Sequence, residues 1–309
     1  MGSGEFAASH FPCLRYDWIS DFRSNKKLIR RTLGLHHSKS AIQILKSTIR
    51  MAPALPHMQP IYHQIRQRAR QIILRHPTPD FYHDHGPDYE ASRKLFDSDL
   101  AVKKLLSFVA ATLEDDFGHG LMHAVKVSHD AGTLMVIEAQ QSGYDNDRLS
   151  RLVCLVQSAG LLHDIKRKRK DHSTHAAIYA KKVLKKYPFS SEEIAIICGA
   201  IQNHEAFKDN IDADTPEGEL VSNCLYDADK FRWGPDNFND TIWDMVSYFN
   251  PPLTEFMKGY PKGMEKIATI KSTFRTPAGK KFGPQFIDLG LAIGEELYEA
   301  IKTEFFKYL

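Results

Sequence analysis

Cysteine is scarce in this chain. The 309 residues include four, Cys13, Cys154, Cys198 and Cys224. No two of them stand at the CxxC spacing of zinc-binding or redox motifs, which excludes a cysteine-based metal site of that kind. Cys154 and Cys198 lie in apolar, helix-like runs, so free buried thiols in a reducing compartment fit better than a disulfide framework.

Long apolar runs are also missing. No run reaches the roughly 18 residues that a membrane-spanning helix needs, so we expect no contact with a membrane. The N-terminal region has no apolar stretch of about 7–15 residues, which argues against a secretory signal. No segment alternates apolar and polar residues for long enough to predict a sheet, and no internal repeat is visible.

An excess of one charge sign is absent from most of the chain. The net charge is +3, but residues 1–50 hold nine Lys or Arg against three Asp or Glu, a local +6, which leaves 3 − 6 = −3 for residues 51–309. Composition therefore gives no strong case for a nucleic-acid-binding surface. The oligomeric state stays open, with a homo-oligomer as one alternative.

The first 50 residues form a separate basic segment. Residues 1–9, MGSGEFAAS, resemble a cloning-derived leader. Residues 10–50 are basic and poor in acids, which fits either extra sequence before a natural start at Met51 or a transit peptide. We expect residues 1–50 to be a leader, a transit-like segment or a disordered basic segment. The expected location is cytoplasmic, with import into an organelle as the alternative if residues 10–50 are native.

Helical periodicity dominates the rest of the chain and predicts an all-α fold. Six prolines between 51 and 94 predict a helix followed by an irregular arm, and residues 95–309 are expected to form one catalytic domain. Ser190 and Glu193 form a helix-start signature. The expected helices cover residues 98–114, 121–142, 147–165, 173–186, 191–204, 216–230 and 284–307.

An ordered series of His and Asp residues is the most informative pattern. The adjacent pair His163-Asp164 follows the apolar Leu161-Leu162, and a carboxylate in such a setting needs a partner for its charge. Imidazole nitrogen and carboxylate oxygen bind divalent metals. Every member of the series is expected near a helix end, where a bundle brings side chains together. The series is His123, His163, Asp164, His175, His204 and Asp229.

Three segments resemble the motifs of the HD-domain superfamily of metal-dependent phosphohydrolases. They are the stretch from Asp116 to Val127, the Ala159–Ile165 stretch AGLLHDI, and the stretch from Leu225 to Lys230. The resemblance implies a helical bundle with a metal site at converging helix ends. Its implied ligands are His123, His163, Asp164 and Asp229, and Asp227 is the less favoured choice for the last.

The resemblance also leaves a second metal ion open. Two-metal members carry two further histidines between the His-Asp pair and the last Asp, and His175 and His204 stand at similar spacing. Asp164 would then bridge both ions. His172 competes with His175, but Ala176-Ala177 after His175 better resembles the family's helix start. The alternative is that these histidines only line the pocket and contact phosphate.

The implied function is hydrolysis of a nucleotide or a related small phosphate ester by metal-activated water attacking phosphorus. The ion would be Mn, Mg, Co, Ni or Fe, in one copy or two. Asp164, Lys166 and Lys230 are the expected catalytic residues, because charge that develops on phosphoryl oxygens needs nearby cations. The expected substrate-binding residues are Lys168, Arg232 and Arg275.

Two other functions stay open. A mixed-valence di-iron HD-type oxygenase is favoured by His175 and His204, whereas the run Lys166–Lys170 favours phosphate. A non-catalytic HD-fold ligand sensor is the third alternative. The tripeptide Gly259-Tyr260-Pro261 spells the name of the HD-GYP phosphodiesterases, but it lies 259 − 205 = 54 residues beyond Glu205 and is interpreted as a coincidental proline turn.

Overall fold

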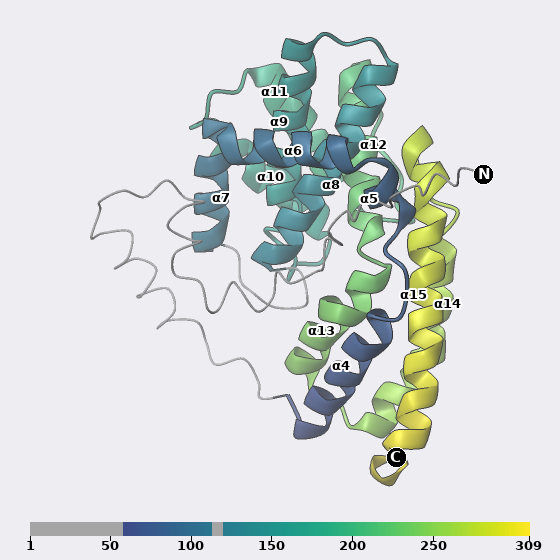
Figure 1. Cartoon of the computed structure of the whole chain (residues 1–309). Coiled ribbons are helices and arrows are strands. Elements are labelled where there is room, and N and C mark those ends of the chain that lie inside the picture. The colour runs from purple at the N-terminus through teal and green to yellow at the C-terminus, as the bar shows by residue number, and fades with distance from the viewer. Residues whose placement is uncertain (1–57, 113–119) are drawn as a thin grey trace, which may run out of the picture. The chain divides into compact units, whose positions relative to one another are not determined.

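The computed structural model describes residues 58–112 and 120–309, and within these residues it contains helices and no strand (Figure 1). The all-α prediction is confirmed for this part of the chain. The expectations for residues 1–50 lie outside the described residues. In chain order the helices are α4 (Pro60–Ile73), α5 (Asp80–Asp84), α6 (Gly86–Ser98), α7 (Leu100–Thr112), α8 (Leu121–Gln141), α9 (Asn146–Leu162), α10 (His172–Leu184), α11 (Ser191–Gln202), α12 (Pro216–Phe231), the π-helix η1 (Asn237–Thr241), α13 (Ile242–Phe249), α14 (Leu253–Ile270), α15 (Pro277–Glu304) and the 3₁₀ helix η2 (Phe306–Tyr308).

Helix α8 is the centre of the bundle that carries the His/Asp series. It packs on α9, α12 and α6, and most of its residues from Val127 to Ala139 are buried. A helix whose residues are buried around nearly its whole circumference must be surrounded by other helices. Because α8, α9 and α12 pack together, the histidines and aspartates that they carry are brought to one region.

Helices α8 and α9 approach closely at Gly160. A Cβ atom there would lie 2.9 Å from the Ser128 Cα atom, closer than a real contact allows. The Ser128 hydroxyl also donates to the carbonyl oxygen of Gln157, 3.0 Å away on α9. Glycine therefore sets the distance between the helix that carries His123 and the helix that ends at His163.

Local signals in the sequence explain where three of the bundle helices begin. Asp145 caps α9 by accepting from the Arg148 amide. Ser190 and Glu193 form the predicted capping box of α11. Thr215 caps α12 by accepting from the Gly218 amide, and Pro216 occupies its first turn, where no N–H is needed.

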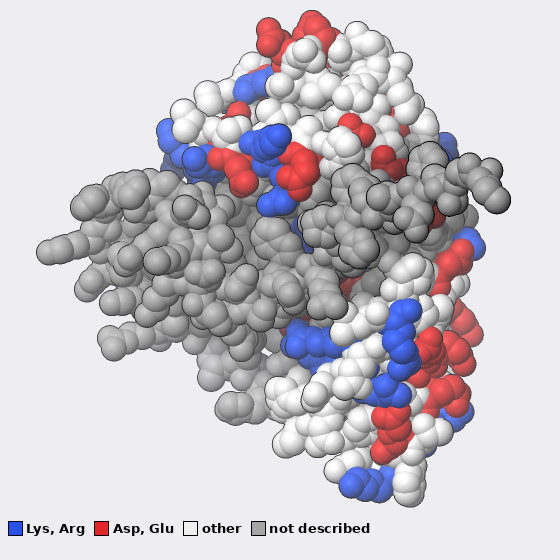
Figure 2. Space-filling model, viewed as in Figure 1, with Lys and Arg blue, Asp and Glu red and all other residues white. Residues whose placement is uncertain are grey.

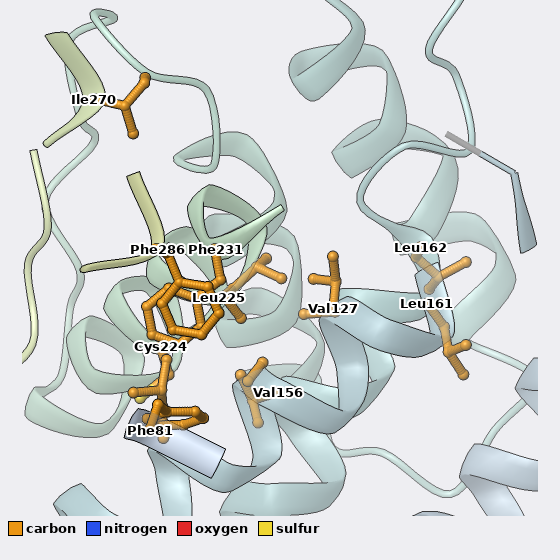
Figure 3. Close-up of a cluster of buried hydrophobic side chains, with 14 of the residues drawn as sticks. Phe81, Val127, Val156, Leu161, Leu162, Cys224, Leu225, Phe231, Ile270 and Phe286 are labelled. Atoms are coloured by element: carbon orange, nitrogen blue, oxygen red, sulfur yellow. The ribbon is translucent and has the colours of Figure 1, made fainter. Parts of the chain in front are cut away.

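An aromatic cluster joins the bundle to the C-terminal helix. Phe231 at the end of α12 stacks on Phe286 of α15 with ring centroids 4.1 Å apart (Figure 3). Phe81 of α5 meets Phe231 edge-on at 5.1 Å. All three rings are buried. Offset and edge-to-face aromatic pairs of this kind each add roughly 0.5–1.5 kcal/mol beyond their burial.

The stretch before the bundle is more regular than expected. Residues 60–98 form α4, α5 and α6 rather than one helix and an irregular arm. Pro60 and Pro87 lie in the first turns of α4 and α6, where proline is tolerated, and Pro79 is the N-cap residue of α5. The helix expected over 98–114 is present as α7, but it begins at Leu100, because the Asp99 carboxylate accepts from the Ala101 and Val102 amides, and residues 113–114 lie outside the described residues.

Two further expectations were wrong. Gly259-Tyr260-Pro261 lies inside α14 and is no turn, and the Tyr260 hydroxyl donates to the Gly294 carbonyl of α15 at 2.8 Å. The last helix begins at Pro277, seven residues before the expected start at 284, because Thr276 caps it and accepts from the Gly279 amide. Among the described helices none is both long enough and apolar enough to span a membrane.

Candidate metal centre

Four of the expected ligands come together from three helices. The Nε2 atom of His123 lies 3.2 Å from the Nε2 atom of His163 and 3.3 Å from Oδ1 of Asp229. Oδ2 of Asp164 lies 3.3 Å from His163 Nε2 and 3.8 Å from His123 Nε2. Metal bonds of ~2.0–2.2 Å place neighbouring ligand atoms about 3.0–3.6 Å apart, which agrees with three of these separations, and the fourth, 3.8 Å, is slightly longer. We call these four residues the first group.

A second group lies on the other oxygen of Asp164. Its Oδ1 atom is 3.3 Å from Nε2 of His172 and 3.5 Å from Nε2 of His204, and the two nitrogens are 3.2 Å apart. The expectation for His204 agrees with this placement, but the one for His175 does not. His175 is exposed, and His172, one turn earlier on α10, points to Asp164 instead.

The histidines are held in the orientation that metal binding requires. Nδ1 of His163 donates to the carbonyl of Gly160 at 2.8 Å, and Nδ1 of His204 donates to the carbonyl of Ile201 at 2.6 Å. Each carbonyl belongs to the last turn of a helix, where it has no partner within the helix. A proton fixed on Nδ1 leaves the Nε2 lone pair for the centre of the group, as is usual for histidine ligands. The donor set therefore fits a divalent ion.

Charges in the first group are strongly coupled. Burial alone would lower the pKa of His163, but the carboxylates of Asp164 and Asp229 outweigh it and raise that pKa to about 10. Burial alone would raise the pKa of Asp229, but Lys230 and the two histidines hold it well below its usual range. Burial lowers the pKa of His204. A metal ion bound here would displace a proton from His163.

Lys230 and Lys166 do not occupy the positions expected of catalytic cations. Lys230 is buried, and its Nζ atom donates to Oδ2 of Asp229 at 2.6 Å and to the carbonyl of His204 at 2.9 Å. It orients a ligand rather than facing a substrate. The Nζ atom of Lys166 lies over the ring of Tyr179, 3.9 Å from its centroid, and Lys168 is exposed on the same loop.

Arg232 and Arg275 were expected to bind substrate and are instead engaged within the protein. Arg232 is buried and forms ion pairs with Asp130 and Asp236. Arg275 lies over the ring of Tyr226, 3.5 Å from its centroid, and donates to the Asn203 carbonyl at 3.1 Å. Apart from Asp236, which follows Arg232 by four residues, these partners could not be seen in the sequence, because Asp130 and Asn203 lie 102 and 72 residues away along the chain.

Asp227 has a structural role that separates it from Asp229. Its carboxylate accepts from the amides of Arg275 and Thr276, each at 2.8 Å, where the last long helix begins. Two residues along a helix turn the side chain through about 200°, so Asp227 and Asp229 point in opposite directions. Burial raises the pKa of Asp227 to about 6. The preference for Asp229 as the ligand agrees with this geometry.

Sequence reasoning missed two residues beside the second group. Nη1 of Arg167 lies 2.8 Å from Nε2 of His172 and 3.9 Å from Oδ1 of Asp164, so a guanidinium occupies part of the space a cation would take. Glu205 places Oε1 3.4 Å from Nδ1 of His172. The sequence feature that could have identified them is their closeness to expected ligands. Arg167 follows Asp164 by three residues, and Glu205 follows His204 directly.

No model of a known protein family, no curated protein and no solved structure matches this chain.

Proposed function

We propose that this chain is a phosphohydrolase that binds two neighbouring divalent ions and acts on a nucleotide or a related small phosphate ester. The observation that carries the proposal is the position of Asp164, whose two carboxylate oxygens each face a different pair of histidine nitrogens. Divalent ions would supply the usual chemistry, acidifying a water molecule and polarising a phosphoryl oxygen. This function and this arrangement are what the HD-type resemblance implies.

The protein's own residues would prepare the site in three ways. Lys230 keeps the Asp229 carboxylate ionised and oriented. The helix-end carbonyls of Gly160 and Ile201 fix the histidine rings. Arg167 was not among the expected cations, but it contacts the second group and keeps 37% of its side chain exposed. It therefore replaces Lys166 as the group that would bind phosphate oxygen.

The test is a metal-dependent screen. Protein stripped with a chelator would be reloaded separately with Mn, Mg, Co, Ni and Fe and assayed for phosphate release from nucleotides and phosphate esters. We expect release that needs metal and is lost in Asp164→Asn, a variant of nearly the same shape. Circular dichroism would verify that the variant is folded. Full activity of folded Asp164→Asn would contradict the proposal.

A di-iron oxygenase is the second candidate, because each group contains two histidines and such sites suit iron as well as other divalent metals. Iron-loaded protein that consumes oxygen with an organic substrate and shows a mixed-valence electron resonance signal, without releasing phosphate from any substrate, would favour it. A folded protein that binds no metal would favour the ligand sensor.

A further inference from the structure

One face of α10 carries cations and aromatic rings in a line. His175, Tyr179 and Lys182 are spaced by four and three residues, which places them on one side of the helix, and Lys186 lies in the turn that follows its last residue, Leu184. We call this face, with Phe108 and Lys104 of α7 beside it, the α7–α10 strip. None of these residues belongs to the metal groups or to the ion pairs around them.

The strip begins at the metal groups. Arg167 contacts His172 at the start of α10, and its neighbour Lys166 covers the ring of Tyr179 about two turns further along the helix. Tyr179 stacks on Phe108 of α7, with ring planes inclined by 24° and centroids 6.4 Å apart. Cation and ring therefore alternate from the second group toward the C-terminal end of α10.

The strip ends in a pocket. Phe108, Val183 and Tyr187 form its apolar wall, and Lys104 and Lys186 line it as well, around a volume of about 260 Å³. Both lysines are exposed. A pocket with an aromatic wall and ammonium groups beside it suits a flat ring that is attached to an anion.

Among the described residues no carboxylate forms an ion pair with the lysines of the strip. Lys104, Lys182 and Lys186 have no such partner there, and the neighbouring Lys181 and Lys185 have none either. The surface over α4 and α15 differs, because basic and acidic side chains alternate there (Figure 2). Its pairs include Arg68 with Glu304 and Arg75 with Glu296.

We propose that the α7–α10 strip binds single-stranded nucleic acid and leads its phosphates to the metal groups. A line of cations follows a phosphate backbone, and rings between them can stack on bases of any sequence. Helix α10 has 13 residues and is therefore about 20 Å long. That length matches a short single-stranded site of roughly 4–6 nucleotides. The assignment of the strand as substrate rests on the proposed function.

Single-stranded nucleic acid fits better than an anionic membrane. A membrane-binding helix places several large apolar side chains on its outer face. On α10 only Ile178 is a large exposed hydrophobic residue, with 53% of its surface exposed. The aromatic rings of the strip, Phe108 and Tyr179, are half-buried, so they expose too little apolar surface to insert into lipid.

The test measures binding separately from hydrolysis. Anisotropy of a fluorescent single strand of about 12 nucleotides would be titrated with the full chain in chelator, so that no cleavage occurs. Lys182→Gln/Lys186→Gln would be compared with Lys258→Gln/Lys262→Gln, which removes two exposed lysines at the same spacing from α14. We expect about tenfold weaker binding for the first pair and less than about twofold for the second. The slope of log K against log salt should fall by about 1.4 for the first pair only.

Three outcomes would overturn the inference. They are no binding of the strand by the unaltered protein, equal binding by both double variants, and tighter binding to phosphatidylglycerol vesicles than to the strand. If one of these three outcomes occurred and phosphate release still depended on Asp164, the proposed function would stand. The proposal that the α7–α10 strip binds nucleic acid would then be wrong. Binding that depends on Lys182 and Lys186, with no phosphate released from any substrate, would support the strip as a binding surface and contradict the hydrolase.

Discussion

Single side chains decide which histidines face Asp164. His172 and His175 lie one turn apart at the start of α10, yet only His172 reaches Asp164. The choice depends on Asp171, whose left-handed backbone (φ 54°) directs the chain into α10 just before His172. Among residues other than glycine, aspartate is one of those that adopt this conformation most often, but the sequence does not show which aspartate will adopt it.

We expect His172→Ala to bind one ion fewer than the unaltered chain and His175→Ala to bind the same number. The reason is that His172 supplies a nitrogen to the second group, whereas the His175 ring is exposed. Metal analysis of manganese- or iron-loaded protein after gel filtration measures the ratio. Two ions in His172→Ala, or one in His175→Ala, would show that the second group is wrongly composed.

His129 shows how a histidine of the same helix can be structural. It follows His123 by six residues, and its ring lies edge-on to Phe96 with centroids 4.6 Å apart. Burial lowers the pKa of His129 to about 3. It therefore stays uncharged at neutral pH, and its substitution should affect stability rather than metal binding.

His129→Phe should make stability less sensitive to acid. In the unfolded chain this histidine takes up a proton near pH 6.5, but in the folded protein only near pH 3. The unfolding free energy of the unaltered protein therefore falls as pH drops below about 6.5, by at most ~1.4 kcal/mol per pH unit from this group. Urea unfolding at about pH 7 and pH 5 measures the difference between the two proteins. Identical pH slopes would contradict the burial of an uncharged ring.

The helices themselves position the metal groups through their ends. His123 lies at the start of α8, His163 and His204 follow the last turns of α9 and α11, and Asp229 lies in the last turn of α12. Most of this was predictable, since the helices of the bundle follow from periodicity and capping residues. The ion pair of Arg232 with Asp130 and the contacts of Arg275 with Tyr226 and Asn203 were not, because partners distant in sequence leave no local pattern.

Glycine substitutions in α9 and α11 should have opposite effects. Gly160→Ala forces a Cβ atom against the Ser128 backbone, so we expect a lower melting temperature and weaker metal binding. Gly199→Ala meets nothing within 4 Å and should raise the unfolding free energy by roughly 0.5–1 kcal/mol. Thermal melts and metal titration of the two variants provide the comparison. Equal behaviour would show that the α8–α9 approach does not limit the site.

The buried core of the described residues extends beyond the helices that carry the His/Asp series. Helix α4 buries Ile61, Tyr62, Ile65 and Ile72, and the Tyr62 hydroxyl donates to the carbonyl of Pro251 at 2.9 Å. Burial of each such side chain contributes about 1.5–3 kcal/mol, and the sum approaches the 5–15 kcal/mol that stabilises a typical domain. The segment before the bundle is therefore part of the fold.

Shortened chains test this. A chain that begins at Met51 keeps α4, and we expect it to melt cooperatively, bind metal and retain its specific activity. A chain that begins at Pro77 lacks α4 and should lose the cooperative transition. Circular dichroism melting and metal analysis distinguish the two. Loss of folding in the Met51 chain would show that residues 1–50 contribute to the domain.

The carboxylate of Asp164 has a consequence for the order in which ions are loaded. The first group owns a second carboxylate, Asp229, but the second group, defined by His172, His204 and the shared Asp164, has none. An ion bound to the first group would already be neutralised in part by Asp164, which is the only carboxylate of the second group. A site with fewer anionic ligands binds cations more weakly, so the second ion would bind with lower affinity. If the chain binds both proposed ions, their loading would be anticooperative and sequential. At limiting metal the singly occupied form would predominate, and the abundance of free ions would set the fraction of protein that carries a complete pair.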